Sequence, residues 1–319
     1  MVKIANRINR FLEQSMPWLA PLGVTLGVIF PAVFLEIRPY IPWLFGAMTL
    51  AGALRLRVGE LGRAVSSPIP ILLFFITARV FMPLIAFSLG SLIFRNDPDI
   101  VAGYVLLYSV PTAITSFIWV TIFKGDLALI LAIILLDSLL APLLVPVTLQ
   151  LLLGSGITID TTGLAVSMVY LILIPTILGV SLNEFSKGKI PALVSPWLNP
   201  FSKATMPFVI AANAAAVAHQ IRPDNPLMWV IIIVCFTMII IGFACGKLIG
   251  LAAKIDKEKQ SALFFASGLR NTAAALVLGT EFFPASAALP AVFGIMLQQT
   301  TAAIAGRIFL GKIRKDVEN

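Results

Sequence analysis

Long apolar stretches follow one another along the chain, separated by short polar connections. A helix needs about 20 mostly apolar residues to cross the hydrocarbon core of a bilayer, so this pattern predicts an all-α polytopic membrane protein. We predict ten transmembrane helices, five in each half of the chain. Their predicted bounds are 18–35, 40–54, 68–94, 100–123 and 127–153, and then 163–185, 202–219, 227–253, 261–283 and 285–310.

The predicted helices divide into an N-terminal part at 1–186, with the first six, and a C-terminal part at 187–319, with the last four. The stretch 187–200, rich in Pro and Lys, links the two parts. Because five is an odd number, a second set of five helices enters the membrane in the reverse orientation. We therefore predict two inverted five-helix repeats, in which the fourth and ninth helices correspond.

Both of these corresponding helices contain residues that interrupt an apolar run. In the fourth, Pro111 removes a backbone donor, and the hydroxyls nearby can bind freed backbone groups or a ligand. In the ninth, the stretch 266–276 places Gly268, Arg270 and Asn271 close to the middle of the bilayer. Two broken helices at corresponding places are the best indication in a sequence of a transporter's binding site.

Arg79, Asp137 and Arg270 lie well inside predicted helices, where an isolated charge is very unfavourable. Arg270 has two interpretations that can both hold: its guanidinium presents positive charge to an anion, or it forms a structural ion pair with Asp137. Asp137 either pairs with Arg270 or Arg79, or carries a proton in coupled transport. Arg79 either neutralises Asp137 or snorkels through a cavity.

Each interruption also creates a new helix N-terminus, whose free N–H groups and positive dipole end favour carboxylates. This predicts an anionic substrate bound at the two breaks. The candidate binding residues are Thr112, Thr115, Ser116, Arg270, Asn271 and Thr272, with Asn213 of the seventh helix facing the substrate from the other side. A structural role, capping the half-helices, explains the same residues. Gln298 and Gln299 either contact the crossing of the broken helices or bind neighbouring helices.

Composition and charge narrow the functional class. Only 12% of the residues are charged, about half of what a soluble domain carries. The net charge of +8 does not indicate a nucleic-acid partner, because the positive residues are scattered over loops. With the N-terminus inside, 18 Lys and Arg residues fall on the cytoplasmic side and three outside, so both termini are predicted to be cytoplasmic. No paired acid and base or His/Glu metal spacing indicates an enzyme.

The two breaks resemble those of the bile acid:sodium symporter superfamily, a group of secondary transporters of organic anions. The resemblance rests on residues 111–116, Lys124-Gly125-Asp126, Pro142, Gly268, Asn271 and the alanine run after it. It implies a core domain at 68–154 and 227–310 that moves against a panel domain at 17–54 and 163–220. It also implies that the fourth and ninth helices unwind and cross.

Several side chains that bind sodium in the sodium-coupled members of this superfamily are missing here. The corresponding positions are Phe117, Ile130, Ile134, Ala266 and Arg270. We therefore expect transport that is not strictly sodium-coupled, with no cofactor and no metal site. Proton coupling stays an alternative.

These observations predict a secondary transporter of the bacterial inner membrane, working by alternating access. The expected cargo is a small or amphipathic organic anion, either bile-acid-like or a carboxylate. The alternatives are a sodium-coupled symporter with backbone ligands, and a channel or sensor on the same fold. The expected partners are the anion and the lipid bilayer, and the expected state is a monomer.

Overall fold

The computed structural model describes residues 2–59, 62, 68–154 and 160–311. In these ranges every regular element is helical, and the backbone bridges outside helices amount to one isolated pair. Large apolar side chains lie on the outside of the bundle, among them Trp18, Leu151 and Ile308. Soluble proteins rarely expose so much apolar surface, so these faces suit lipid. The structure agrees with the predicted all-α polytopic membrane protein.

The described residues of the first part of the chain form eight α-helices and two short helical turns. They are α1 (Val2–Ile29), α2 (Pro31–Leu35), η1 (Arg38–Tyr40), α3 (Ile41–Ala53), α5 (Pro68–Phe75), η2 (Ile76–Phe81), α6 (Met82–Ile93), α7 (Pro98–Ser109), α8 (Ser116–Ile122) and α9 (Leu127–Leu153).

The second part continues the helical bundle. Its segments are α10 (Thr161–Met168), η3 (Val169–Leu173), α11 (Ile174–Phe185), α12 (Lys189–Ala216), η4 (Ala218–Gln220), α13 (Pro226–Ala252), α14 (Lys257–Gly268), α15 (Thr272–Phe282), η5 (Ala285–Ala288) and α16 (Leu289–Leu310).

Among the described residues, five helices are long and apolar enough to cross a membrane. They are Pro68–Ile93, Leu127–Leu153, Thr161–Phe185, Pro226–Ala252 and Ala285–Leu310. Trp18–Ile29 and Pro31–Ala53 pass the same test together but bend by 105° where they join, and would make a sixth if counted as one. The count of ten transmembrane helices and their inverted repeat stay predictions.

Two helices begin earlier than the sequence predicts. The first begins at Val2 and not at residue 18, and α12 begins at Lys189, so the stretch predicted as a link is mostly helical. Pro196 and Pro200 lie inside α12, and each lacks the N–H that an uninterrupted helix uses. Contact between α1 and α12 along their length supports the helical backbone there.

The α1–α12 pair packs very closely because small residues face each other. A Cβ atom added at Gly27 would lie 2.2 Å from the carbonyl oxygen of Ala211, so only glycine allows this approach. Small residues of this kind let two helix backbones pack together in a membrane. The helices α1 and α12 therefore pack tightly against each other on one side of the bundle.

Two wide turns interrupt otherwise regular helices, and each one ends two residues before a proline. The π-helical turn η2 precedes Pro83, and the π-helical turn η3 precedes Pro175. Because proline lacks an N–H and its ring crowds the preceding turn, the local backbone widens there. The turn η2 contains Arg79.

Several helices start at an Asp or Asn whose side chain accepts a backbone N–H of the first turn. Asp126 caps α9 in this way, Asp160 caps α10, Asn225 caps α13 and Asp256 caps α14. Such caps satisfy one of the free donors at a helix start. They set the points at which the chain turns back into the bundle.

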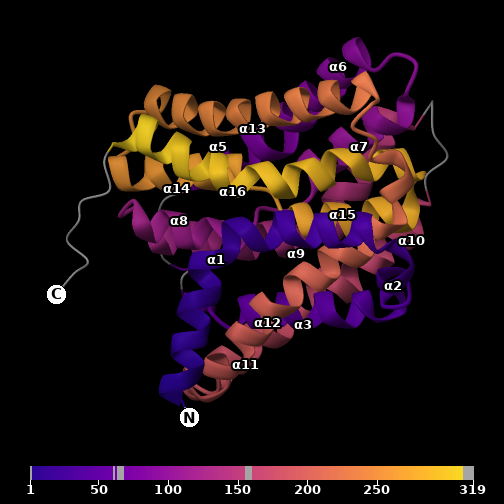
Figure 1. Ribbon diagram of the computed structural model, residues 1–319. Coiled ribbons are helices and arrows are strands. Elements are labelled where there is room, and N and C mark those ends of the chain that lie inside the picture. Colours follow the sequence, from indigo (N-terminus) through magenta and orange to yellow (C-terminus); the bar gives the residue numbers. More distant parts are fainter. Residues whose placement is uncertain (1, 60–61, 63–67, 155–159, 312–319) are drawn as a thin grey trace.

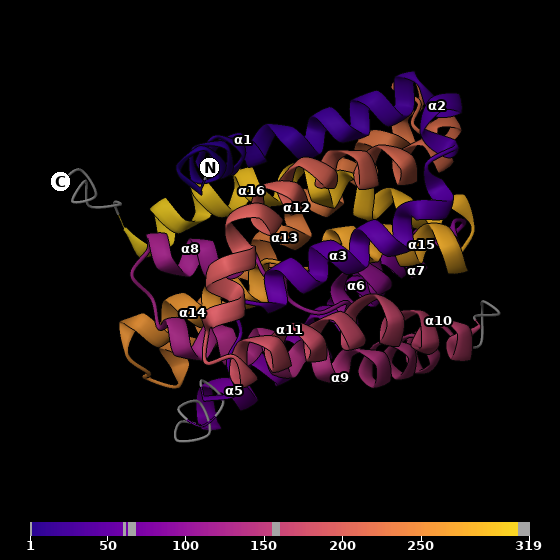
Figure 2. The same ribbon diagram turned by 90° about the horizontal axis from the view of Figure 1, so that it is seen from below.

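The helices lie in two groups that face each other. Figure 1 shows α3, α11 and α12 together on the lower side and α13, α14 and α16 on the upper side. Figure 2, turned by 90°, shows α1 and α9 along opposite edges of the bundle. The short helices α8 and α15 lie between the two groups, and each belongs to one of the interrupted segments.

Candidate functional site

The first interruption lies between α7, which ends at Ser109, and α8, which begins at Ser116. Val110 leaves the helix in an extended conformation, with φ −62° and ψ 157°. Pro111 follows it and has no N–H to continue the helical pattern. The break predicted from the proline and the hydroxyl residues is therefore present.

The second interruption lies between α14, which ends at Gly268, and α15, which begins at Thr272. Leu269 is extended, with φ −107° and ψ 110°. A Cβ atom added at Gly268 would lie 2.2 Å from the ring of Phe243, so the chain leaves α14 where only glycine fits. The Asn271 side chain then accepts the N–H of Ala274, 3.1 Å away, and starts α15.

The two extended segments meet inside the bundle and pair with each other. The N–H of Ala113 donates to the carbonyl of Leu269 at 3.1 Å, and the N–H of Asn271 donates to the carbonyl of Pro111 at 2.9 Å. These two bonds frame an antiparallel bridge between Thr112 and Arg270. Unwound backbone groups thus find partners in the opposite break, as they must where lipid offers none.

The bridge leaves the N–H groups of Thr112 and Arg270 pointing outward, and a polar side chain binds each one. The Asp137 carboxylate accepts the N–H of Thr112 at 2.7 Å. The Gln298 amide accepts the N–H of Arg270 at 2.9 Å and donates to the Arg270 carbonyl, also at 2.9 Å. Asp137 belongs to α9, which follows α8 along the chain, and Gln298 belongs to α16, which follows α15 and η5. Each of the two side chains binds the outward N–H of one bridge residue.

Asp137 also forms a buried ion pair with Arg79. The Nε atom of Arg79 donates to Asp137 Oδ1 at 2.8 Å, and its Nη2 atom binds the same oxygen. The Nη1 atom of Arg79 donates to the carbonyl of Ser109, at the end of α7. The pair therefore stabilises both sides of the first break: the cation binds the C-terminal carbonyl of α7, and the anion binds the N–H of Thr112.

Arg270 is buried, with 1% of its surface exposed, and it has few partners. Its Nη2 atom lies 3.5 Å from the carbonyl of Ala78, while Nε and Nη1 have no hydrogen-bond partner in the described structure. No ion pair joins Arg270 to Asp137 among the described residues, because the carboxylate binds Arg79. Of the pairings that the sequence left open for Asp137, the structure has the one with Arg79.

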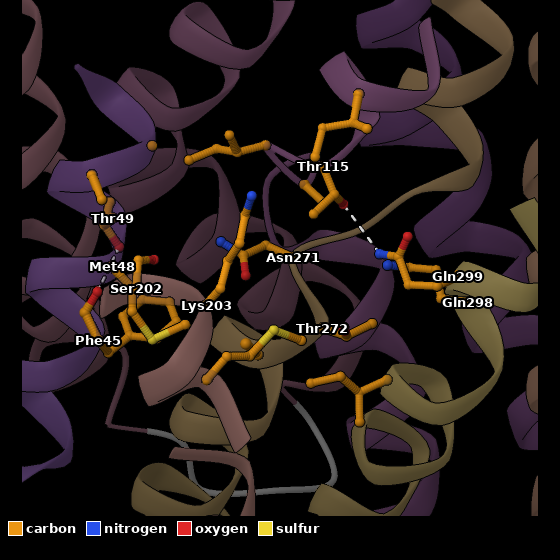
Figure 3. A pocket seen from close by; sticks show the side chains of 18 of the residues that line it. Phe45, Met48, Thr49, Thr115, Ser202, Lys203, Asn271, Thr272, Gln298 and Gln299 are labelled. Carbon is orange, nitrogen blue, oxygen red and sulfur yellow. Dashed lines mark hydrogen bonds between the residues drawn. The ribbon is translucent and has the colours of Figure 1, made fainter. Parts of the chain in front are cut away.

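A cavity of about 170 Å³ lies beside the crossing, between the two groups of helices. One wall comes from α3 and α12, and the other comes from the two breaks, α8, α15 and α16. Figure 3 shows Thr49, Ser202 and Lys203 on the side of α3 and α12, and Thr115 and Gln299 on the opposite side. The polar members of the lining are Thr49, Arg55, Thr115, Asn199, Ser202, Lys203, Arg270, Asn271, Thr272, Gln298 and Gln299.

Four of the predicted binding residues line this cavity, namely Thr115, Arg270, Asn271 and Thr272. Thr112 and Ser116 are outside its described lining. Their hydroxyls bind backbone carbonyls of the crossing: Thr112 binds those of Ala266 and Leu269, and Ser116 binds that of Ala113. The sequence left a structural role open for these hydroxyls, and their bonds are of that kind.

Asn213 is also outside the described lining of the cavity. It lies farther along α12, where its Nδ2 atom donates to the carbonyl of Val209 at 2.8 Å. Its Oδ1 atom accepts the hydroxyl of Thr280 in α15, also at 2.8 Å. Asn213 therefore joins α12 to α15, away from the cavity at which the sequence placed it.

Sequence reasoning missed the cavity residues of α12 and judged the two glutamines of α16 only weak candidates. Lys203 was counted with the cytoplasmic positive residues, yet it is 93% buried and its Nζ atom donates to Asn9 at 2.9 Å. Asn199, Lys203 and Met206 lie three or four residues apart, which places them on one face of a helix. Gln299 donates to Thr115 at 3.2 Å and accepts from the indole of Trp119 at 2.9 Å.

Apolar helices facing outward, two broken segments that meet within the bundle, and a cavity beside them define an integral membrane protein organised for transport. The chain belongs to the sodium bile acid symporter family, whose family model matches residues 41–223, more than half of its length. The resemblance seen at the breaks is thereby confirmed.

The relatives found among known proteins agree with this family. The chain is 38% identical to the uncharacterized protein YbaS of Bacillus subtilis over 91% of its own length and 95% of that protein's. It is 24% identical to the uncharacterized sodium-dependent transporter YocS of Bacillus subtilis, over 92% and 90% of the two chains. It is 26% identical to the probable sodium/metabolite cotransporter BASS1 of Arabidopsis thaliana chloroplasts, over 86% and 68%. The chain is a membrane transporter and not an enzyme.

Proposed function

We propose that the protein is a secondary transporter that carries a compact organic anion across the cytoplasmic membrane by alternating access. The observation that carries this proposal is the buried guanidinium of Arg270, which lies at the crossing and whose Nε and Nη1 atoms have no hydrogen-bond partner among the described residues. Burying a cation away from water is costly unless an anion pairs with it. A negatively charged cargo supplies that anion.

The charges around the crossing support an anionic cargo. Arg79 and Asp137 neutralise each other, and Arg270 adds one positive charge beside them. The described cavity lining contains further positive residues, Arg55 and Lys203, and no Asp or Glu. The start of α15 lies in the same lining and directs the positive end of its helix dipole toward the cavity.

The size of the cavity favours a compact carboxylate over a steroid. A cavity of about 150 Å³ is large enough for a molecule such as benzene, and the one described here is about 170 Å³. Phe45, Met48, Ile114 and Met206 give it an apolar part beside the polar groups at the breaks. We infer that the cargo has one charged group and a short apolar chain.

We also propose the domain motion that the sequence implies. The panel, at 17–54 and 163–220, contains α3 and α12, which form one wall of the cavity. The core, at 68–154 and 227–310, contains both breaks and α16, which form the other wall. A site between two bodies opens to either side of the membrane when one moves against the other. The matching hydrogen bonds of Asp137 and Gln298 at the two breaks support two inverted five-helix repeats. The proposal also places both termini in the cytoplasm, on the distribution of Lys and Arg along the sequence.

Coupling without a strict need for sodium is part of the proposal. The guanidinium of Arg79 already binds the free carbonyl at the end of α7, and Arg270 lies beside the carbonyl of Ala78. The Arg79 cation thus occupies a position at which a bound cation would stabilise the unwound backbone of the first break, while Ala78 belongs to η2. The names of YocS and BASS1 make sodium coupling the main alternative. Proton carriage by Asp137 is the second.

A binding screen followed by uptake tests the proposal. Pyruvate, 2-oxoisovalerate and taurocholate are added to the purified protein in sodium chloride or in choline chloride, and thermal unfolding is followed. A ligand at 100 times its Kd stabilises the folded state by about 2.7 kcal/mol. We expect the two compact carboxylates, or one of them, to raise the melting temperature equally in both salts. The ligand is then tested for saturable uptake and counterflow in proteoliposomes.

Arg270→Gln is the decisive variant. Arg222→Gln is its matched control because Arg222 is exposed and, among the described residues, forms an ion pair only with exposed Asp224. We expect Arg270→Gln to abolish stabilisation and uptake while the protein still inserts, and the control to retain both. Undiminished uptake by Arg270→Gln contradicts the proposed site. A strict sodium requirement contradicts the proposed coupling, and a current that does not saturate favours a channel.

A further inference from the structure

Three elements of the proposed panel domain form hydrogen bonds with the C-terminal end of α15, which belongs to the proposed core domain. Arg38 of η1 donates from Nη2 to the carbonyl of Thr280 at 2.9 Å. Asn213 of α12 accepts the Thr280 hydroxyl at 2.8 Å. Ser167 of α10 donates to Oε1 of Glu281 at 3.4 Å. These bonds join the proposed panel to the proposed core at a single short segment.

The other end of the same interface is arranged differently. There the cavity lies between α3 and α12 on one side and the breaks and α16 on the other, and its lining includes Arg55 and Asn199. Contact remains at Gly52 of α3, where an added Cβ atom would lie 2.3 Å from Ile114 of the first break. The hydrogen bonds between the two proposed domains thus lie at the end of α15, and the cavity lies toward the end where α3 finishes. This is the arrangement expected of a carrier that is closed at the end of α15.

The contact between Asn213 and Thr280 is the most buried of the three. Asn213 is 2% exposed and lies in a run of alanines, so its carboxamide has few polar neighbours. The same carboxamide donates to the carbonyl of Val209 in its own helix, which fixes its orientation toward α15. A buried amide with both groups bound is costly to open, because opening leaves its oxygen without a partner.

We propose that Arg38, Ser167 and Asn213 form a gate that closes one side of the transporter through their hydrogen bonds to Thr280 and Glu281 at the end of α15. This inference rests on the proposed function, since alternating access requires these hydrogen bonds to break in each cycle. Asn213 is then a positioning residue for the transport cycle and not a residue that contacts the cargo. Under the predicted topology this gate lies on the outer side.

Chemical labelling of a cavity residue tests the gate without knowledge of the cargo. Cys235 and Cys245 are first replaced by alanine, and Thr49→Cys is introduced, since Thr49 lines the cavity on the panel wall. A membrane-impermeant thiol reagent is then applied to either side of oriented vesicles. In the closed arrangement described here, the reagent reaches this cysteine mainly from the side opposite the gate.

Asn213→Leu and Thr280→Val each remove the buried hydrogen bond while preserving side-chain shape. Losing such a bond shifts a two-state equilibrium by about three- to tenfold, so labelling from the gate side is expected to rise by that factor. Thr237→Val is the matched control, because the Thr237 hydroxyl binds only the carbonyl of Ile233 in its own helix among the described residues. The double variant is expected to shift labelling no further than either single one. Size-exclusion profiles establish that each variant is folded.

The possible outcomes separate the gate from the proposed function. Faster labelling from the gate side in both variants, with Thr237→Val unchanged, supports the gate. Labelling of the parent from both sides that neither variant changes overturns the gate and leaves alternating access in place. Labelling from one side only, in the parent and in both variants, overturns alternating access together with the gate.

Discussion

The ion pair between Arg79 and Asp137 leads to a specific prediction: neutralising one partner should destabilise the folded protein more than neutralising both. Asp137 is fully buried and binds two groups of Arg79 and the N–H of Thr112. Asp137→Asn keeps an acceptor for Thr112 but leaves the Arg79 guanidinium buried without a counter-charge. Arg79→Gln leaves the carboxylate alone in the same way. Breaking a buried pair from one side costs about 3 to 5 kcal/mol.

The expected change in melting temperature follows from the size of the chain. Globular proteins unfold with an entropy of about 2 cal/mol/K per residue. For 319 residues, a loss of about 4 kcal/mol therefore lowers the melting temperature by about 6 °C. The double variant Arg79→Gln/Asp137→Asn carries neither charge and retains groups that can bind each other and the backbone. It should melt above either single variant.

Thermal unfolding in detergent, followed by circular dichroism, measures these differences. Asp160→Asn is the matched control, because Asp160 caps α10 near the surface and Asn is about as good a cap as Asp. The control should melt with the parent. A double variant that loses as much as the two single losses together would refute the reasoning, since it would show that the two charges do not stabilise each other. So would an Asp137→Asn variant that melts with the parent.

Two further predictions concern the crossing. Gln298→Leu removes both side-chain bonds to the Arg270 peptide and should lower the melting temperature by about 3 to 9 °C, given about 1 to 3 kcal/mol for each of the two buried groups left unpaired; an unchanged melting temperature would contradict the assigned bonds. Gly268→Ala places a Cβ against the Phe243 ring and should cost about 1 to 3 kcal/mol, with Phe243→Leu restoring part of the loss. Gly46→Ala is the control, since the nearest atom there is 3.8 Å away, and equal stability of both alanine variants would contradict the packing.

The positions of both breaks could be predicted from the sequence, because the residues that cause them are local. Pro111 lacks a donor wherever the chain goes, and Gly268 with Arg270 interrupts an apolar run in a way that lipid does not tolerate. The family resemblance at the same residues added the expectation that the two breaks cross. Neither inference needed long-range contacts.

Partners across the bundle could not be predicted, because they depend on helix rotation and depth. Asp137 had two arginines within possible reach, and spacing along the chain gives no preference between them. In the structure, the π-helical turn η2 contains Arg79 and brings its guanidinium to both Asp137 and the end of α7. The sequence shows Pro83 but not the rotation that this turn produces.

The start of α12 was missed for a similar reason. Its prolines and lysines are typical of a connection, and only packing against α1 makes helix the better solution. The extra turns bring Asn199 onto the cavity wall, one helical turn before Lys203, which lies near the start of the helix predicted at 202–219. Farther along α12, Asn213 lies outside the described cavity lining and accepts the hydroxyl of Thr280.

Different side chains bind the backbone at the two breaks: an ion pair at the first and a neutral amide at the second. This difference bears on the role of the Arg270 guanidinium. At the first break, a charged pair binds the backbone, and its two charges cancel. At the second break, the neutral amide of Gln298 does the same work at both groups of the Arg270 peptide. Among the described residues, the Arg270 guanidinium makes one long contact, to the carbonyl of Ala78, which does little to offset the desolvation cost of its burial. The anionic cargo proposed above accounts for this charge.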